Sequence, residues 1–416
     1  MKILLINKFH YKRGGSETYY FAQAEALTAS GHEVVFFAMQ DPKNLPCEQS
    51  KYFVSNVEYN DHKQNFLSQI SSLIKIIYSY EAKERMEQLI RDEKPDIAHI
   101  GLLHRQITFS VVDILKKYNI PVIMTMHDLI FTCPCYTMLS HGKICKDCLH
   151  GSIWNCVKKS CLKDSKAKSL IGVIETLFLK YRKYYDKIDL YIAECNKYKD
   201  LMVESGFTRS RIIQMTNFLP INQEYKFNSN YDDYILYFGR YSQEKGILTL
   251  LAAYQKMHCK NRLVIVGAGP LRDKIESYIR ENHVENVELN GAIYGEKMEE
   301  IIEKSRVIVA PSEWYENCPY AIMQSMAKGK IVVASKIGGL PQLIENGVSG
   351  FLFEPGNVED LAKKLNYVLS LEKDEYERIS HRILDSAKRQ FYWKTYFERL
   401  LTEYSSLIGR HKSFKN

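Results

Sequence analysis

Short apolar runs alternate with longer amphipathic stretches along most of the chain. The first half has apolar runs at residues 2–7, 33–39, 96–101, 121–128 and 189–195. The second half has them at residues 234–240, 262–269, 287–293, 306–312, 331–337 and 350–355. Stretches with helical periodicity separate them, for example Glu17–Ala29, Glu81–Lys94 and Gly246–Met257. Strands spaced by helices of this length predict parallel sheets built of βαβ units, which is an α/β fold.

The alternation restarts near Tyr231, after the polar segment 222–233. We therefore predict two Rossmann-like domains that face each other across a cleft, residues 1–218 and 219–395. The segment after them, residues 396–416, continues an amphipathic pattern and is expected to form a helix that crosses back over the first domain. Ligands of such domains bind at the carboxyl ends of the strands, so the loops that follow the strands are the places to search.

Net charge and the lengths of the apolar runs limit the classes of ligand and the cellular location that the sequence suits. The 57 Lys and Arg residues outnumber the 49 Asp and Glu residues, a net charge of +8 that suits an anionic ligand or membrane surface. No basic stripe alternates with base-reading residues, which disfavours nucleic acid as a partner. The sequence contains no run of about 18 uncharged apolar residues, so no membrane-spanning helix is expected. The apolar run at residues 2–7 ends at the charged Lys8 and does not continue into the apolar core of a signal peptide. We therefore expect residues 2–7 to form a strand and the protein to be in the cytoplasm.

Three loops after predicted strands suit phosphate binding. Gly14 and Gly15 precede a helix, whose first N–H groups could face a phosphate, although a flexible turn explains them equally well. Arg240 and Lys245 could together neutralise a diphosphate, or they could lie on a solvated basic loop. Gly267 lies in a turn that lacks the third glycine of a dinucleotide fingerprint, so a tight turn lining a nucleotide cleft is favoured over bound NAD.

Two further strand ends carry polar residues. His127 follows the run 121–126, at the position where active-site groups lie in such folds, which favours a functional role over a core histidine. The segment 311–330 holds Glu316 in a loop and Gln324 on the helix that is expected to follow.

Taken in order, these motifs resemble those of the retaining glycosyltransferases of family 4, which have the GT-B fold. The resemblance covers nearly the whole chain. It is carried by "GGSE", "GHEV", "PDIAHI", "PVIMTMHD", "FGRYSQEKGI", "VGAGP", "PSEWYEN", "GGLPQLI" and "NGVSGFLF". Each motif is weak alone, and their order along one chain makes the resemblance specific.

The resemblance implies roles for individual residues. The glycine loop, at Gly15, would contact donor phosphate, and Arg240 and Lys245 would hold the diphosphate. His127 would lie beside the transferred sugar, and Glu316 would contact the sugar hydroxyls.

The resemblance also implies that the backbone of Pro319, Tyr320 and Ala321 faces the sugar or the phosphates. The family's second acid, which holds the nucleotide ribose, is replaced here by Gln324. Gln342 likewise stands where the family usually has glutamate.

By this resemblance we expect a retaining, metal-independent hexosyltransferase that needs no cofactor. It would move a sugar from a UDP- or GDP-sugar to a glycan or lipid-linked acceptor in bacterial capsule, O-antigen or exopolysaccharide synthesis. Two alternatives remain open at this point: a sugar-nucleotide epimerase of the same fold, and a degenerate sugar-nucleotide-binding subunit without activity.

The segment Ala167–Lys187 is amphipathic and basic, with an apolar helical face composed of Leu170, Ile174, Leu177, Phe178 and Tyr181. One interpretation is a contact with an anionic membrane, which would make the protein peripheral at the inner face of the cell membrane. The other is a helix whose apolar face packs on the sheet and whose charges are solvated.

Six of the ten cysteines fall between residues 133 and 161, which reads as an insertion in the first domain. One CxC and one CxxC spacing favour a structural zinc site composed of Cys133, Cys135, Cys145 and Cys148. The alternative is a set of reduced thiols. We predict no catalytic metal site.

Overall fold

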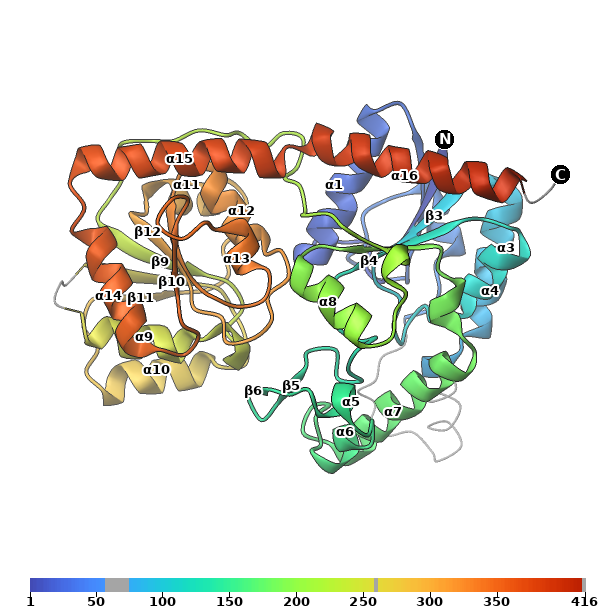
Figure 1. Ribbon diagram of the computed structural model, residues 1–416, viewed down its shortest axis with the longest axis horizontal. Helices are drawn as coiled ribbons and strands as arrows, with labels where there is room; N and C mark the ends of the chain where they lie inside the picture. Colours follow the sequence, from blue (N-terminus) through green and yellow to red (C-terminus); the bar gives the residue numbers. More distant parts are fainter. Residues whose placement is uncertain (57–74, 258–260, 414–416) are drawn as a thin grey trace.

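The computed structural model describes residues 1–56, 75–257 and 261–413. Figure 1 shows two α/β domains side by side, bridged by a long helical segment along one edge. Each domain is built on a six-stranded sheet, and the pairings within both sheets are parallel. The predicted α/β class with two Rossmann-like domains is confirmed.

The N-terminal sheet has the strand order β2-β1-β3-β4-β7-β8. Its strands are β1 (Lys2–Ile6), β2 (Glu33–Phe37), β3 (Ile97–Ile100), β4 (Val122–Met126), β7 (Leu190–Ala193) and β8 (Ile212–Gln214). The helices are α1 (Gly15–Ala29), α3 (Tyr80–Glu93), α4 (Ser110–Lys117), α7 (Lys166–Tyr181) and α8 (Asn196–Glu204). The central strands β3, β4 and β7 are buried along their whole length, as their uninterrupted apolar runs predict.

The C-terminal sheet has the order β11-β10-β9-β12-β13-β14. Its strands are β9 (Tyr234–Phe238), β10 (Arg262–Val266), β11 (Val287–Asn290), β12 (Val307–Ala310), β13 (Ile331–Ser335) and β14 (Phe351–Phe353). Its helices are α9 (Ile247–Gln255), α10 (Arg272–Glu281), α11 (Glu296–Lys304), α12 (Tyr320–Ala327), α13 (Leu340–Leu343), α14 (Val358–Leu369) and α15 (Lys373–Phe391).

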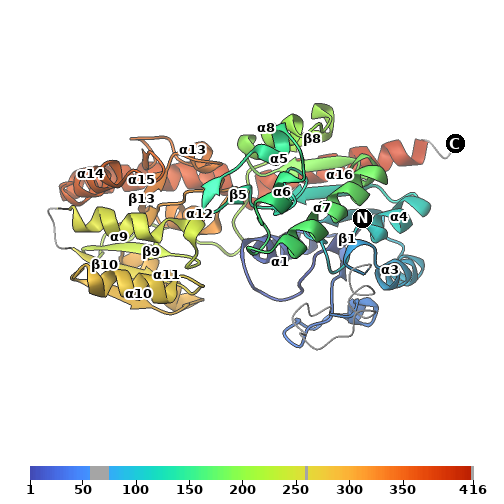
Figure 2. The ribbon, with the colours of Figure 1, turned by 90° about the horizontal axis from the view of Figure 1, so that it is seen from below.

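Between β4 and α7 the chain forms the cysteine-rich insertion. It holds an antiparallel hairpin, β5 (Leu139–Ser140) with β6 (Lys143–Ile144), and two short helices, α5 (Asp147–His150) and α6 (Asn155–Lys158). Figure 2 shows the hairpin extending toward the C-terminal domain. Strand β8 was not predicted, because it has only three residues, of which one is buried and two are partly buried, and its apolar signal is weak.

The chain crosses between the domains twice, and the crossings touch each other. On the first crossing Leu219 N donates to Phe391 O over 3.0 Å, and Phe391 ends α15 on the second. Helix α16 (Trp393–Ser413) then returns along the N-terminal domain, where the hydroxyl oxygens of its Tyr396 and of Tyr19 lie 2.7 Å apart. The helix thus begins a turn earlier than residue 396, and residues 414–416 of the expected segment lie outside the described residues.

Within the described residues, no helix is both long enough and apolar enough to span a membrane.

Candidate active site

The carboxyl-end loops of the two sheets meet at the starts of α1 and α12. A Cβ added at Gly15 would lie 3.7 Å from Tyr320 Cδ2, so the glycine loop of one domain contacts the first turn of α12 in the other. Both helices present their first backbone N–H groups here, and such groups bind anions. The fold therefore brings Gly14 and Gly15 together with Pro319, Tyr320 and Ala321.

The buried Glu316 and the partly exposed Lys245 form an ion pair in this region. Lys245 Nζ lies 2.6 Å from Glu316 Oε1, and it also lies 5.4 Å from the centre of the Trp314 ring. Burial alone would raise the pKa of Glu316, but the Lys245 charge and hydrogen bonds from Lys245 and Ser312 outweigh it, so the pKa is lowered. Glu316 is thus held as a carboxylate.

The backbone of the Glu316 loop rests on two glycines. Gly338 has a φ of +61°, and a Cβ there would lie 2.2 Å from Glu316 O, a contact that no larger residue could make. Gly339 N donates to the same carbonyl over 2.7 Å. The two glycines of the "GGLPQLI" motif therefore fix the position of the Glu316 backbone.

Arg240 and Gly267 lie at the ends of neighbouring strands, β9 and β10. The Arg240 side chain is exposed and has no hydrogen bond or ion pair among the described residues, so its guanidinium is available to a ligand. Gly267 has a different role, since a Cβ there would lie 1.8 Å from Gly239 O. Gly267 allows two backbone loops to touch, and this positions Arg240.

His127 lies directly after β4 and is paired with a carboxylate that the sequence analysis did not assign. His127 Nδ1 lies 2.8 Å from Glu194 Oε1, and both side chains are buried. Burial alone would lower the pKa of His127, but the Glu194 charge and hydrogen bond outweigh it and raise the pKa. His127 Nε2 is buried without a hydrogen-bond partner in the described chain, which leaves it free for a substrate atom.

Glu194 also joins three parts of the chain. Asn217, on the first crossing, donates to Glu194 Oε1 over 2.9 Å. Asn317, in the C-terminal domain, donates to Glu194 Oε2 and lies 2.9 Å from Met126 O. In the sequence, Glu194 could have been noticed as an acid directly after the apolar run 189–193. Its partners are too distant in sequence to be predicted from spacing.

The two glutamines lie in different surroundings. Gln324 is half-buried on α12, and its side chain makes no hydrogen bond with the described residues. Gln342 spans the domains instead: its Oε1 accepts from Asn196 N over 2.8 Å, and its Nε2 donates to Thr216 Oγ1 over 3.0 Å. Gln324 thus keeps its hydrogen-bonding groups unused within the described chain, whereas Gln342 joins the two domains.

Comparison with models of known protein families shows the family to which this chain belongs. The profile described as "Glycosyltransferase Family 4" matches residues 13–222, and "Glycosyl transferases group 1" matches residues 221–384. The chain belongs to glycosyltransferase family 4. The predicted family is therefore confirmed, and the protein is a glycosyltransferase.

Relatives and solved structures agree with this assignment. A 42.6 kDa protein of the cps region of Klebsiella pneumoniae is 25% identical over 356 residues, covering 82% of this chain and 87% of that protein. The putative colanic acid biosynthesis glycosyltransferase WcaL of Salmonella typhimurium is 27% identical over 157 residues, 36% of this chain and 37% of that protein. Anabaena HepE, solved with UDP and glucose, has a TM-score of 0.69 at 17% identity and covers 98% of this chain and 100% of that one. The last likeness confirms the GT-B fold.

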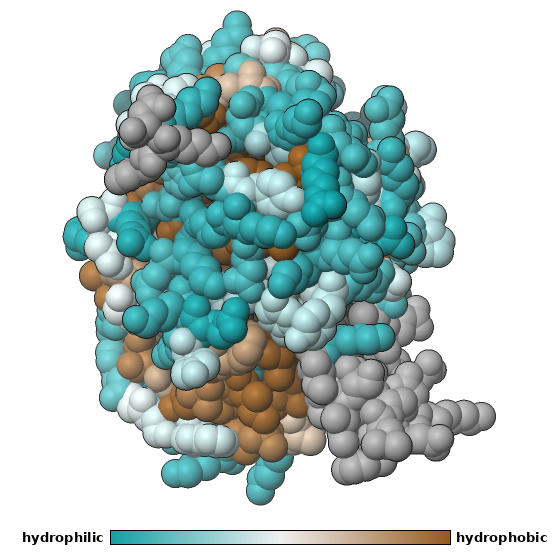
Figure 3. Space-filling model, turned by 90° about the vertical axis from the view of Figure 1, so that its right-hand side faces the viewer, coloured by the Kyte–Doolittle hydropathy of each residue, from teal (hydrophilic) through white to brown (hydrophobic). Residues whose placement is uncertain are grey.

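In this glycosyltransferase, helix α7 exposes the apolar face singled out in its sequence. The exposed large apolar side chains on α7 are Leu170, Ile174, Leu177 and Tyr181, with Tyr181 86% exposed. The helix packs inward through Val173 and Leu179 instead. Figure 3 shows an apolar patch low on the N-terminal domain, where α7 lies in Figure 1. Phe178, the fifth residue of the predicted face, packs on the core of the N-terminal domain, so the face is exposed in four of its five residues and packed in one.

The cysteines of the insertion are free thiols in the described chain. Four of them line one enclosed cavity of about 10 Å³: Cys133, Cys145, Cys148 and Cys161. Cys135, predicted as a ligand, does not line this cavity, and its sulfur lies 3.4 Å from Thr137 Oγ1. As the side chains stand, no three His, Cys, Asp or Glu residues among those described are placed to hold one metal ion.

Proposed function

We propose that the protein transfers a hexose from a nucleotide-diphosphate sugar, with retention and without a divalent ion. The observation that carries this proposal is the Lys245–Glu316 ion pair at the meeting point of the glycine loop and α12. A donor diphosphate placed there would face Lys245, Arg240 and the first N–H groups of two helices. These groups meet the charge that develops on the leaving diphosphate.

The sugar would then lie between Glu316 and His127. Glu316 is a carboxylate and can accept from sugar hydroxyls, while the raised pKa of His127 favours the form that donates from Nε2. In the transfer, the bond from the sugar C1 to the phosphate oxygen breaks. A bond from C1 to the acceptor hydroxyl oxygen forms on the same face, and the hydroxyl proton passes to the departing diphosphate.

The carboxylates around this position support that proton path. Glu194 is occupied by His127, Asn217 and Asn317. Glu316 is occupied by Lys245 and Ser312. Lys245 and Ser312 lower the pKa of Glu316 and so make it a weaker base, while Glu194 orients His127, and we therefore assign the acceptor proton to the departing phosphate.

We further propose that the acceptor is a glycan or lipid-linked sugar at the inner face of the cell membrane. The relatives from a cps region and from colanic acid biosynthesis support polysaccharide assembly as the setting. The exposed face of α7 supports the membrane contact, since apolar side chains on a basic helix suit an anionic interface. A groove of about 300 Å³ at the end of this helix is lined by Lys180, Lys183 and Arg211, which suits lipid headgroups.

The transfer is tested by presenting the pure protein with a panel of UDP- and GDP-sugars and scoring thermal shifts. A ligand at 100 times its dissociation constant should stabilise the fold by about 2.7 kcal/mol. The best donor is then incubated with candidate acceptors, with and without EDTA, and the anomeric configuration of the product is determined by NMR. Inversion, or loss of activity with EDTA, contradicts the mechanism. An epimerised donor in the absence of acceptor indicates the epimerase alternative, and donor binding without turnover indicates the degenerate subunit.

The membrane contact is tested with vesicles of phosphatidylglycerol and phosphatidylcholine. Changing Lys180 and Lys183 to Gln should lower vesicle affinity by about tenfold or more, since each cation near an anionic surface contributes about 1 kcal/mol. Arg182 is left intact because it pairs with Asp113. Changing two exposed lysines of the other domain, Lys274 and Lys297, is the matched control. Equal binding by both double variants rules the contact out.

A further inference from the structure

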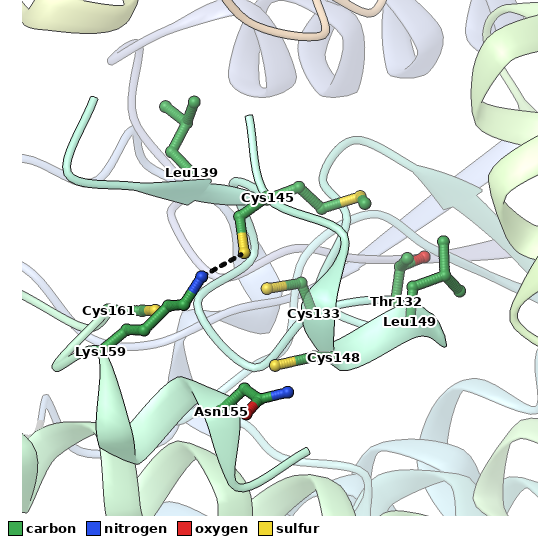
Figure 4. Close-up of a pocket in the computed structure, with 10 residues that line it drawn as sticks. Thr132, Cys133, Leu139, Cys145, Cys148, Leu149, Asn155, Lys159 and Cys161 are labelled. Carbon is green, nitrogen blue, oxygen red and sulfur yellow. Dashed lines mark hydrogen bonds between the residues drawn. The ribbon is translucent and has the colours of Figure 1, made fainter. Parts of the chain in front are cut away.

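The cavity in the cysteine-rich insertion is bounded by four thiols from separate turns of the chain. Cys145 follows strand β6, Cys148 lies in α5, and Cys161 follows α6, while Cys133 lies in the loop after β4. Figure 4 shows the four sulfur atoms directed toward a common space, which the Lys159 side chain also reaches.

We propose that this cavity binds one zinc ion through Cys133, Cys145, Cys148 and Cys161. Four thiolates are the usual ligands of a structural zinc site, and a CxxC pair commonly supplies two of them. Such a centre carries a net charge of −2, and an ammonium group beside it offsets this charge. Lys159 provides one, with its Nζ 3.8 Å from Cys145 Sγ, and because it also forms an ion pair with Asp147 over 2.5 Å it offsets part of that charge. The small cavity suits a single ion rather than an iron–sulfur cluster.

The ligands must turn slightly to bind. At present Cys148 Sγ donates to Ile153 O over 3.6 Å, and Cys133 Sγ lies 3.3 Å from Cys135 Sγ. These contacts explain why no three ligands converge on one point as they stand. A change of one staggered rotamer moves a cysteine sulfur by about 3 Å, which is enough to exchange such weak contacts for a metal bond.

The structure also revises which cysteines take part. The spacing in the sequence favoured Cys135, whereas the fold places Cys161 on the cavity wall and leaves Cys135 beside Thr137. Cys135 is therefore left out of the ligand set because its sulfur lies off the cavity wall. Cys161 lies at the C-terminal end of the insertion and would supply the fourth ligand.

The zinc ion would stabilise the hairpin that reaches the other domain. Cys145 N donates to Met138 O over 2.8 Å, which ties a ligand to the base of the hairpin. At the hairpin turn, a Cβ added to Gly142 would lie 2.2 Å from Gln243 Nε2. Gln243 belongs to the short helix Gln243–Lys245 that carries the Lys245 of the proposed donor site. The metal site thus orders a contact between the domains, and its existence does not depend on the proposed transfer.

The test measures the metal content of the full-length protein purified from zinc-supplemented cells and dialysed against EDTA. We expect about one zinc per chain in the wild type, and a loss of at least about tenfold in each of C133S, C145S, C148S and C161S. C47S and C135S are the matched controls and should retain their zinc. Circular dichroism of each variant verifies that it is folded.

Two further readouts separate this site from adventitious binding. Cobalt titration should give the intense d–d and thiolate charge-transfer bands of a tetrahedral four-sulfur site in the wild type and in C135S, and weaker bands in C161S. Hydrogen exchange across residues 139–145 should speed up at least about tenfold when a strong chelator removes the metal. Zinc-free wild-type protein, iron with acid-labile sulfide, or zinc lost in C135S and kept in C161S would each overturn the proposal.

Discussion

Glu316 and Glu194 are both buried carboxylates of the same site, and they are held in different ways. Glu316 takes its partners, Lys245 and Ser312, from loops of its own domain. Glu194 takes His127 from its own domain, Asn217 from the crossing between domains and Asn317 from the other domain. One carboxylate is thus preassembled within a domain, and the other is complete only when the domains are docked.

This difference separates a charged pair that one domain assembles from a charged pair that needs both domains. The C-terminal domain can hold its charged pair ready for a diphosphate on its own. His127 receives its full set of supporting contacts only through a network that spans both domains, so docking of the domains and orientation of the histidine are coupled. Changes at Glu316 should therefore act on the chemistry alone, and changes at Glu194 should also act on pH dependence and domain docking.

The largest effect is expected for Glu316→Gln. The change removes the charge that pairs with Lys245 and that contacts the sugar in the proposed mechanism, so turnover should fall by about 100- to 1000-fold. The measurement is steady-state turnover with the donor identified by thermal shift, and a parallel thermal shift shows whether the donor still binds. Turnover within threefold of the wild type would remove Glu316 from the site.

A smaller effect, with a distinct signature, is expected for Glu194→Gln. The carboxylate raises the pKa of His127 above its usual value, so the protonated form persists to higher pH. Without it, burial dominates and the pKa falls, so the basic limb of the kcat/KM profile should move to lower pH. We expect a loss of about 10- to 100-fold at neutral pH.

The same substitution should change how stability depends on pH. Because the folded-state pKa of His127 is raised, its stabilisation is fully present below its unfolded value of about 6.5 and is lost as pH rises through the folded value. Melting temperatures measured across this range should show that loss in the wild type and not in Glu194→Gln. Parallel curves for the two proteins would contradict the ion pair.

Gln324→Glu should affect binding more than chemistry. The glutamine side chain is uncommitted, and a carboxylate would offer a ribose diol a charge-assisted hydrogen bond that is stronger by on the order of 1 kcal/mol. The donor KM should change several-fold, with turnover within about twofold. An unchanged KM together with collapsed turnover would show that Gln324 serves the reaction itself.

The smallest effect is expected for Gln342→Glu. One carboxylate oxygen can still accept from Asn196 N, and the other can accept from the Thr216 hydroxyl in place of the present donation. A negative charge at the first residue of α8 favours its dipole by about 0.3–1 kcal/mol. The melting temperature should therefore stay level or rise slightly, with donor KM unchanged. A marked loss of stability would mean that the amide donor is essential.

The alternation of apolar runs predicted the fold because buried parallel strands need continuous apolar residues and their helices need one apolar face. It placed the strands of both sheets except β8, whose three residues are too few for a pattern. Motif order likewise pointed to His127, Glu316 and the glycine loop. Glu194 carries no such motif, and its role depends on partners more than 20 residues away.

Local residue chemistry thus determined by itself that this chain forms two parallel-sheet domains and that the carboxyl ends of their strands carry cations, glycines and acids. Only the tertiary structure decided which of these act together. It paired Lys245 with Glu316 and His127 with Glu194, it exposed most of the predicted apolar face of α7, and it placed Cys161 in place of Cys135 on the cavity wall. Periodicity along a chain reports which residues share an element. Contacts between elements depend on packing across long sequence separations, and spacing alone does not encode them.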